Sequence, residues 1–307
     1  MIFQGAAPAL VTPFTSSGEI DPPAFCRLID RQISAGSAAL VVLGTTGENA
    51  TIAPVERSRL VELAIGHVNG RVPVIIGTGN NSTAESITFS QEADRLGADG
   101  LLVVGPYYNK PPQAGFKAHV AAIAEAAPCP IILYNVPGRT AFDATAETIL
   151  SLAEEVPSVA GVKEASGDLA KVTDIMAGRP KNFAVYAGDD ELTLFFMALG
   201  ADGVISVVSN IFPRLMSEIV RCGLAGDIEG AAKVHYMLLP AMRACFFDTN
   251  PIPVKSMLVR LGLIGPHLRL PLVPSDADVD ERAMAAIAPL LEQAASTSPG
   301  ADKALLL

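Results

Sequence analysis

The chain has 307 residues, half of them hydrophobic, a mean hydropathy of +0.38 and a formal net charge of −10. This composition is typical of a core-rich globular protein of one large domain or two modest ones. No cluster of lysine and arginine is present to neutralise phosphates, so we expect no nucleic-acid partner. No apolar run approaches the roughly 18 residues that span a membrane, so we expect no membrane partner either.

The four cysteines, Cys26, Cys129, Cys222 and Cys245, are widely spaced along the chain. No pair has the spacing of a zinc ribbon or a redox motif. We interpret them as reduced, packed thiols of a cytoplasmic protein. The first residues also lack the basic segment of a signal peptide, which favours the same location.

A five-residue segment that repeats along the chain indicates the arrangement of strands and helices. Residues 96–100 read Leu-Gly-Ala-Asp-Gly and precede the apolar run 101–104, and the same five residues return at 199–203 before the run 204–207. A looser copy at residues 35–39 precedes a third apolar run. In each copy a glycine ends a helix and a buried strand follows. Apolar strands between helices are typical of a parallel sheet covered by helices.

Eight strands are expected, at spacings of roughly 20–35 residues, which suit strand–loop–helix units. In chain order they cover residues 9–12, 40–43, 74–76, 101–104, 131–134, 159–163, 184–187 and 204–207. Helical patterns lie between them, for example at residues 54–68 and 82–96. The sequence therefore predicts an α/β fold, a (β/α)8 TIM barrel. A doubly wound open sheet is the alternative, which the strand count and the lack of a dinucleotide-binding fingerprint disfavour.

After Ser206 the pattern becomes helical throughout, at residues 212–222, 227–247 and 253–261. We therefore expect a small C-terminal helical appendage on the barrel. The predicted division is a catalytic barrel over residues 1–225, a C-terminal helical region over 226–295 and a disordered tail over 296–307.

In a TIM barrel the active site lies at the carboxyl ends of the strands. Lys163 ends the apolar run 159–163, where an ammonium group loses hydration. That loss favours the neutral amine, which can attack a ketone to form a Schiff base. Lys163 is therefore the candidate nucleophile toward a keto acid. Lys255, behind Pro251 and Pro253, is a weaker candidate because it is expected to begin a helix.

The other strand ends carry groups that suit the same chemistry. After the second strand the chain reads Gly-Thr-Thr-Gly-Glu, and Thr45 and Thr46 can present backbone N–H groups to a carboxylate. Tyr134 and Tyr108, linked through the Thr45 hydroxyl, can relay protons. Arg139 follows a Pro-Gly turn and can bind a second carboxylate through two parallel hydrogen bonds. Each group alone is ordinary, and their joint placement at successive strand ends favours a catalytic site.

The seventh strand ends in Gly188-Asp189-Asp190, and the eighth in Ile205-Ser206. Adjacent acids at a strand end more often cap a following helix than hold a metal, so we expect no metal site. The sequence contains no P-loop and no metalloprotease motif, and we expect no cofactor.

From residue 8 to about residue 270, the chain resembles the dihydrodipicolinate synthase/N-acetylneuraminate lyase family of class I, Schiff-base aldolases. The motifs that carry the resemblance are Gly-Thr-Thr-Gly-Glu (44–48), Tyr-Tyr-Asn-Lys-Pro (107–111), Tyr-Asn-Val-Pro-Gly-Arg-Thr (134–140), Gly-Val-Lys-Glu (161–164) and Asn-Pro-Ile-Pro-Val-Lys (250–255). The resemblance implies a lyase that condenses pyruvate with L-aspartate 4-semialdehyde in lysine and diaminopimelate biosynthesis.

The resemblance also implies the roles of individual residues. Lys163 forms the Schiff base with pyruvate, and Tyr134 donates and accepts the proton. Thr45 and Tyr108 complete a relay, with Tyr108 contributed by a neighbouring subunit of a homotetramer built from dimers. The residues expected to contact substrate are Thr46, Gly188 and Ile205, with Arg139 receiving the carboxylate of the semialdehyde.

Arg139 distinguishes the subgroups of the family, because the sialate-lyase branch typically carries an apolar residue there. The alternative is another pyruvate-dependent lyase, for sialic or other sugar acids, that shares Lys163 and Tyr134. A noncatalytic barrel that acts as a binding protein is a third interpretation. The intact set of Lys163, Tyr134, Tyr108 and Thr45 disfavours it.

The family further suggests an allosteric lysine site at a dimer interface. The matching positions here are Ala50, Pro54, Arg57, Asn81, Glu85 and Tyr107. Asn81, Glu85 and Tyr107 suit a cationic amino acid, whereas a cation at Arg57 favours its carboxylate and repels its amines. Lysine-sensitive bacterial relatives often have histidines at positions 54 and 57, so feedback inhibition by lysine is a hypothesis here.

Overall fold

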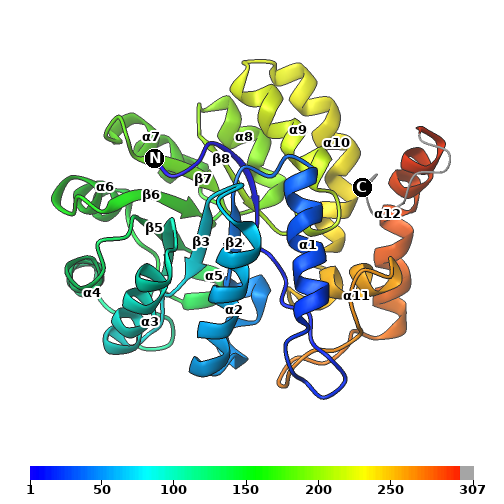
Figure 1. The fold of residues 1–307 in the computed structure, drawn as a ribbon. Helices are drawn as coiled ribbons and strands as arrows, with labels where there is room; N and C mark the ends of the chain where they lie inside the picture. Colours follow the sequence, from blue (N-terminus) through cyan, green and yellow to red (C-terminus); the bar gives the residue numbers. More distant parts are fainter. Residues whose placement is uncertain (298–307) are drawn as a thin grey trace.

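The computed structural model describes residues 1–297, within which eight parallel strands form a barrel surrounded by helices (Figure 1). Around the barrel the strands follow the order β1-β8-β7-β6-β5-β4-β3-β2. Two backbone hydrogen bonds close the ring between the β1 and β2 segments. The Ala38 N–H donates to the Ala6 carbonyl at 2.8 Å, and the Leu10 N–H donates to the Val41 carbonyl at 2.9 Å. The predicted TIM barrel is confirmed.

The strands are β1 (Gly5–Pro8), β2 (Leu40–Val42), β3 (Val74–Gly77), β4 (Gly100–Val104), β5 (Ile131–Asn135), β6 (Val159–Glu164), β7 (Ala184–Ala187) and β8 (Gly203–Ser206). The helices around them are α1 (Pro22–Ser34), α2 (Pro54–Val68), α3 (Thr83–Leu96), α4 (Gln113–Ala126), α5 (Pro137–Thr140), α6 (Ala146–Glu155), α7 (Leu169–Gly178), α8 (Thr193–Ala198) and α9 (Pro213–Leu224). Single 3-10 turns are η1 (Thr45–Gly47), η2 (Asn49–Thr51), η3 (Asp190–Leu192) and η4 (Val208–Asn210). The C-terminal helices are α10 (Ile228–Ala244), α11 (Ile252–Arg260) and α12 (Ala277–Thr297).

The first strand lies earlier in the chain than predicted. The sequence predicts it at residues 9–12, whereas β1 covers Gly5–Pro8 and pairs with β8 over its whole length. Ala9 makes only an isolated bridge, to Val41. The run from residue 5 to residue 11 contains no polar residue, so the local sequence does not mark which part of it pairs.

The strands separate two apolar layers, one inside the barrel and one between the sheet and the helices. Successive side chains of a strand point to opposite faces. On β5, Leu133 joins the outer layer and Tyr134 the inner one. On β6, Val162 joins the outer layer, so Lys163 is directed to the barrel interior. The alternation therefore carries the lysine into the barrel.

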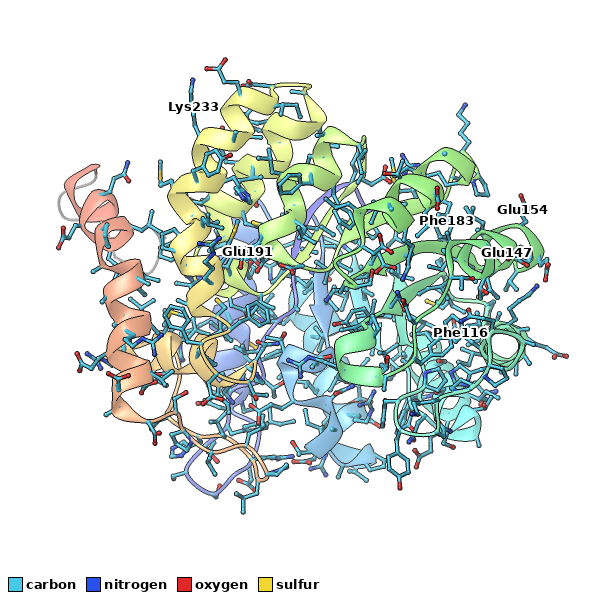
Figure 2. The ribbon with its side chains drawn as sticks, turned by 180° about the vertical axis from the view of Figure 1, so that it is seen from behind. Phe116, Glu147, Glu154, Phe183, Glu191 and Lys233 are labelled. Atoms are coloured by element: carbon cyan, nitrogen blue, oxygen red, sulfur yellow. The ribbon has the colours of Figure 1, made fainter. Side chains whose placement is uncertain are left out.

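Three helices follow the barrel in the region where the sequence predicts them. α10 packs on α8 and α9, and α12 packs on α10 and α11 (Figure 1). Figure 2 places Glu191 beside α10, where its Oε2 lies 2.9 Å from Nε of Arg243. α12 continues to Thr297, two residues into the segment expected to be a disordered tail, and the rest of that segment, 298–307, lies outside the described residues.

All four cysteines are free thiols, Cys26 being half-buried and the other three buried. This finding agrees with the interpretation of the cysteines as packed, unpaired residues. Of the helices within residues 1–297, none is both long enough and apolar enough to cross a membrane.

Candidate active site

Lys163 lies inside the barrel near the carboxyl end of β6. The residue is only 5% exposed. It is the register partner of Tyr134 on β5, and Lys163 Nζ lies 4.3 Å from the centre of the Tyr134 ring. In the described part of the chain, Lys163 takes part in no ion pair. The structure thus places an amine that forms no ion pair against a tyrosine.

A cavity of about 120 Å³ opens at this end of the barrel and contains Lys163 in its wall. Six of the predicted site residues line it together: Thr45, Thr46, Tyr134, Arg139, Lys163 and Gly188. The sequence assigned no catalytic or substrate-binding role to the remaining lining residues, which are Ala9, Gly44, Leu102, Val136, Ala165, Asp189, Val207, Phe246 and Asn250.

Thr45 and Thr46 open η1, a single 3-10 turn after β2. The first N–H groups of such a turn have no partner within it. They are therefore available to an anionic group in the cavity. Glu48 ends the turn in the left-handed region with a φ of 56°.

Gly188 follows β7 and borders the Lys163 side chain. A Cβ atom at this position would lie 3.1 Å from Lys163 Cε, 2.6 Å from Ala165 Cβ and 3.0 Å from the Glu164 carbonyl oxygen. Any larger residue would displace the lysine or the neighbouring backbone. Glycine is therefore favoured here by the close approach of Ala165, the Glu164 carbonyl group and the Lys163 side chain.

Arg139 lies at the mouth of the cavity on the short helix α5. Its side chain donates one hydrogen bond, from Nη2 to the Asn250 carbonyl oxygen at 3.2 Å. Arg139 forms no ion pair with any residue that the structure describes. The guanidinium is thus free to bind a carboxylate that enters the cavity.

Two predicted residues do not line this cavity. Ile205 is fully buried in β8 within the inner apolar layer, and Val207 forms the nearby wall instead. Tyr108 is 89% exposed, with a φ of 72°. Its hydroxyl is therefore not part of the pocket formed by its own chain.

The adjacent acids after β7 accept backbone hydrogen bonds. Asp189 Oδ1 accepts from the Glu191 N–H at 3.0 Å and caps η3, as the sequence suggests. Asp190 Oδ2 accepts from the N–H groups of Val207 at 3.0 Å and Val208 at 2.7 Å. Burial raises the pKa of Asp189, and it raises the pKa of Asp190 to about 6.

Lys255, the weaker candidate nucleophile, lies outside this cavity in the first turn of α11. The residue is 2% exposed, and its Nζ lies 2.5 Å from Glu48 Oε1 and 3.0 Å from the Thr12 carbonyl oxygen. Burial lowers the pKa of Lys255, and the Glu48 carboxylate opposes that shift. Because Lys255 is neutralised by a carboxylate, Lys163 is the buried lysine available for chemistry.

The residues expected to bind lysine also lie outside the cavity. They are Ala50, Pro54, Arg57, Asn81, Glu85 and Tyr107, and all except Arg57 reach the surface. Arg57 is buried and donates from Nη2 to the Gly77 carbonyl oxygen at 2.5 Å. Its guanidinium lies 4.2 Å from the centre of the Phe89 ring, and burial lowers its pKa to about 10. The Arg57 side chain is thus held in the packing between α2 and α3.

Comparison with known proteins decides the family. A model described as the dihydrodipicolinate synthetase family matches residues 2–290 of the chain. The chain belongs to this family. The resemblance carried by the strand-end motifs is therefore confirmed.

Relatives within the dihydrodipicolinate synthetase family are similar to the chain both in sequence and in structure. The 4-hydroxy-tetrahydrodipicolinate synthase of Salinibacter ruber (strain DSM 13855 / M31) is 58% identical over 294 residues, covering 95% of this chain and 97% of the relative. The chloride-inhibited dihydrodipicolinate synthase of Acinetobacter baumannii, solved in complex with pyruvate, has a TM-score of 0.91 and 41% identity, over 94% of this chain and 98% of that chain. The enzyme of Cyanidioschyzon merolae with lysine bound has a TM-score of 0.90 and 40% identity, with the same coverages.

These similarities show the activity of this family member. It is that of a 4-hydroxy-tetrahydrodipicolinate synthase, a lyase of the class I aldolase type in lysine and diaminopimelate biosynthesis. The predicted reaction class is confirmed, and the noncatalytic barrel is set aside.

Proposed function

We propose that the chain condenses pyruvate with L-aspartate 4-semialdehyde in the cytoplasm, and that Lys163 forms the Schiff base with pyruvate. The observation that carries this proposal is the buried Lys163 amine, which lines the cavity and forms no ion pair with any described residue. A related synthase, that of A. baumannii, is solved in complex with pyruvate. The four free cysteines fit a reducing compartment.

The chemistry follows from the groups around Lys163. The amine adds to the keto carbon of pyruvate, and water leaves as the imine forms. Loss of a methyl proton then gives an enamine, whose carbon attacks the aldehyde of the second substrate. Tyr134, whose ring borders Lys163 Nζ, is the proton donor and acceptor for these steps, and Thr45 continues the relay. Thr46 and its neighbouring N–H groups hold the pyruvate carboxylate. Gly188 shapes that end of the site, and Ile205 supports it from the inner apolar layer without lining the cavity.

Arg139 selects the second substrate by binding its carboxylate at the mouth of the cavity. We expect Arg139→Ala to lower kcat/KM for the semialdehyde by roughly tenfold to a hundredfold, the effect of losing a hydrogen bond to a charged group. Pyruvate adduct formation should be unchanged, because Lys163 is intact. Steady-state kinetics with each substrate varied in turn measures both effects, and Arg139→Lys serves as the charge-retaining control.

Two results would contradict this assignment of the second substrate. One is an equal loss of pyruvate binding and semialdehyde use in Arg139→Ala. The other is faster turnover of N-acetylmannosamine or glyceraldehyde than of the semialdehyde by the unmutated protein, which would favour a sugar-acid lyase.

The proposed assembly is a homotetramer built from dimers, in which Tyr108 completes the relay of a neighbouring copy. The 89% exposure of Tyr108 supports this role, because the side chain is free to enter another subunit.

We also propose lysine as a feedback inhibitor at the site of Ala50, Arg57, Asn81, Glu85 and Tyr107. The C. merolae relative is solved with lysine bound. Initial rates that stay constant at millimolar lysine would rule out this inhibition.

A further inference from the structure

Asn250 carries a buried side-chain amide into the cavity from the segment between α10 and α11. The residue is 5% exposed and lines the cavity together with Lys163 and Arg139. Its Nδ2 donates to Thr46 Oγ1 at 3.0 Å. Its Oδ1 is buried and accepts no hydrogen bond from any described residue. A buried acceptor without a partner is costly, and at a cavity wall a ligand that donates a hydrogen bond accounts for it.

The position of Asn250 indicates which ligand group this acceptor meets. The backbone carbonyl of Asn250 accepts a hydrogen bond from Arg139 Nη2 at 3.2 Å, so the residue that carries the amide contacts the guanidinium. Arg139 is the proposed partner of the only carboxylate of aspartate semialdehyde. The ammonium group of that molecule is attached to the same carbon as the carboxylate. Because Asn250 contacts Arg139 and lines the same cavity, its free acceptor is a candidate partner for this ammonium group.

Asp189 is a second acceptor in the cavity wall, but it is less suited to this task. Its Oδ1 already accepts the Glu191 N–H at 3.0 Å, and its charge acts on Lys163, whereas Asn250 contacts Arg139. The Asn250 amide, in contrast, has its donor end fixed by Thr46 and its acceptor end unoccupied.

We propose that Asn250 Oδ1 binds the α-ammonium group of aspartate semialdehyde while Arg139 binds its carboxylate. The inference rests on the proposed second substrate and on the proposed role of Arg139. Asn250 is then a specificity-determining residue that distinguishes an amino-acid aldehyde from an aldehyde acid without the amino group. Its hydrogen bond to Thr46 joins this contact to the turn that holds pyruvate.

Succinic semialdehyde tests the inference, because it keeps the carboxylate and the aldehyde but lacks the ammonium group. In the full-length protein at saturating pyruvate, we would measure KM for aspartate semialdehyde and the competitive inhibition constant of succinic semialdehyde. Asn250→Leu removes the acceptor at similar volume. It should raise KM about tenfold to a hundredfold while changing the inhibition constant less than about twofold.

Asn250→Asp is the matched control, because it retains acceptor oxygens and can accept the Thr46 hydroxyl proton. Because an acceptor for the ammonium group is retained, its KM for aspartate semialdehyde should lie at least about threefold below that of Asn250→Leu. If Asn250→Leu fails to fold, Asn250→Ser is measured in the same two assays. Equal weakening of both semialdehydes, or an unchanged KM, would overturn the inference.

Failure of the underlying proposal would be recognised separately. In that case the unmutated protein would not use aspartate semialdehyde, or Arg139→Ala would leave its KM unchanged.

Discussion

Asp190 illustrates how burial of a single carboxyl group makes stability depend on pH. The residue is 2% exposed, and burial raises its pKa to about 6 from an ordinary value of about 3.9. The folded protein therefore favours the protonated form more strongly than the unfolded chain does. The resulting stabilisation is complete below about pH 4 and is lost as the pH rises through about 6.

We expect Asp190→Asn to remove this dependence. The asparagine Oδ1 can still accept hydrogen bonds from the N–H groups of Val207 and Val208, and its amide does not titrate. Urea midpoints at intervals between pH 4 and pH 7 provide the measurement. From pH 4 to pH 6 the unmutated protein should lose stability relative to the variant, by roughly 3 kcal/mol at most. Parallel curves for the two proteins would show that Asp190 is not responsible.

At the level of elements, a buried ion pair joins the η1 turn to the C-terminal helices. Glu48 ends η1, and Lys255 lies in α11, with their charged atoms 2.5 Å apart. The two side chains are 1% and 3% exposed, so water does not screen either charge. Glu48 Oε2 also accepts the Arg269 N–H at 3.2 Å. The pair therefore fixes the turn against segments that follow the barrel in sequence.

Removing one charge of this pair should lower the free energy of unfolding more than removing both charges. Glu48→Gln leaves the Lys255 ammonium buried without a counter-charge, and Lys255→Met leaves the Glu48 carboxylate in the same state. Each variant should destabilise the protein by roughly 3–5 kcal/mol. The double variant should lose clearly less than the sum, since neither charge remains. Denaturant midpoints of the four proteins form the cycle, and additive losses would contradict the coupling.

The sequence predicts the helices more closely than the first strand, for reasons that lie in local chemistry. α2 has Pro54 at its first position, and α3 has Ser82 as a cap that accepts the Glu85 N–H at 3.3 Å. Such residues mark helix ends locally. β1 has no comparable marker, because the pairing of Gly5–Pro8 is decided by β8, almost 200 residues later.

Considered as a whole, the molecule presents one predicted site residue to its surroundings rather than to its own cavity. Tyr108 is 89% exposed, and the cavity is lined without it. If Tyr108 acts in a neighbouring copy, each site combines Lys163 of one subunit with Tyr108 of another. Tyr108→Phe and Lys163→Ala then remove residues that different subunits contribute to one site. Mixing the two inactive variants should then restore activity.

The expected recovery follows from counting sites. Half of randomly mixed dimers contain both variants, and one of their two sites then has both Lys163 and a neighbour's Tyr108. Co-refolded one-to-one mixtures should therefore reach roughly a quarter of the unmutated activity. Activity no greater than the mean of the separate variants would mean that Tyr108 does not act across an interface.

Site residues at the carboxyl ends of strands could be predicted from the sequence. Site residues that come from other segments could not. Lys163 and Tyr134 are found by reading the ends of apolar runs, since parallel strands bring those ends together. Asn250 lies 204 residues from Thr46 and reaches the cavity because the chain returns to the barrel after α10. Its motif is visible in the sequence, but the unpartnered acceptor that suggests its role is a property of the packed structure.

The central claim is that Lys163 is the nucleophile, and borohydride trapping with pyruvate tests it most directly. Reduction of the imine links pyruvate to the reacting amine, and peptide mapping by mass spectrometry locates it. We predict one adduct per chain, on Lys163, and none in Lys163→Ala. The paired Lys255 should remain unmodified. An adduct on Lys255, or no adduct on Lys163, would contradict the account.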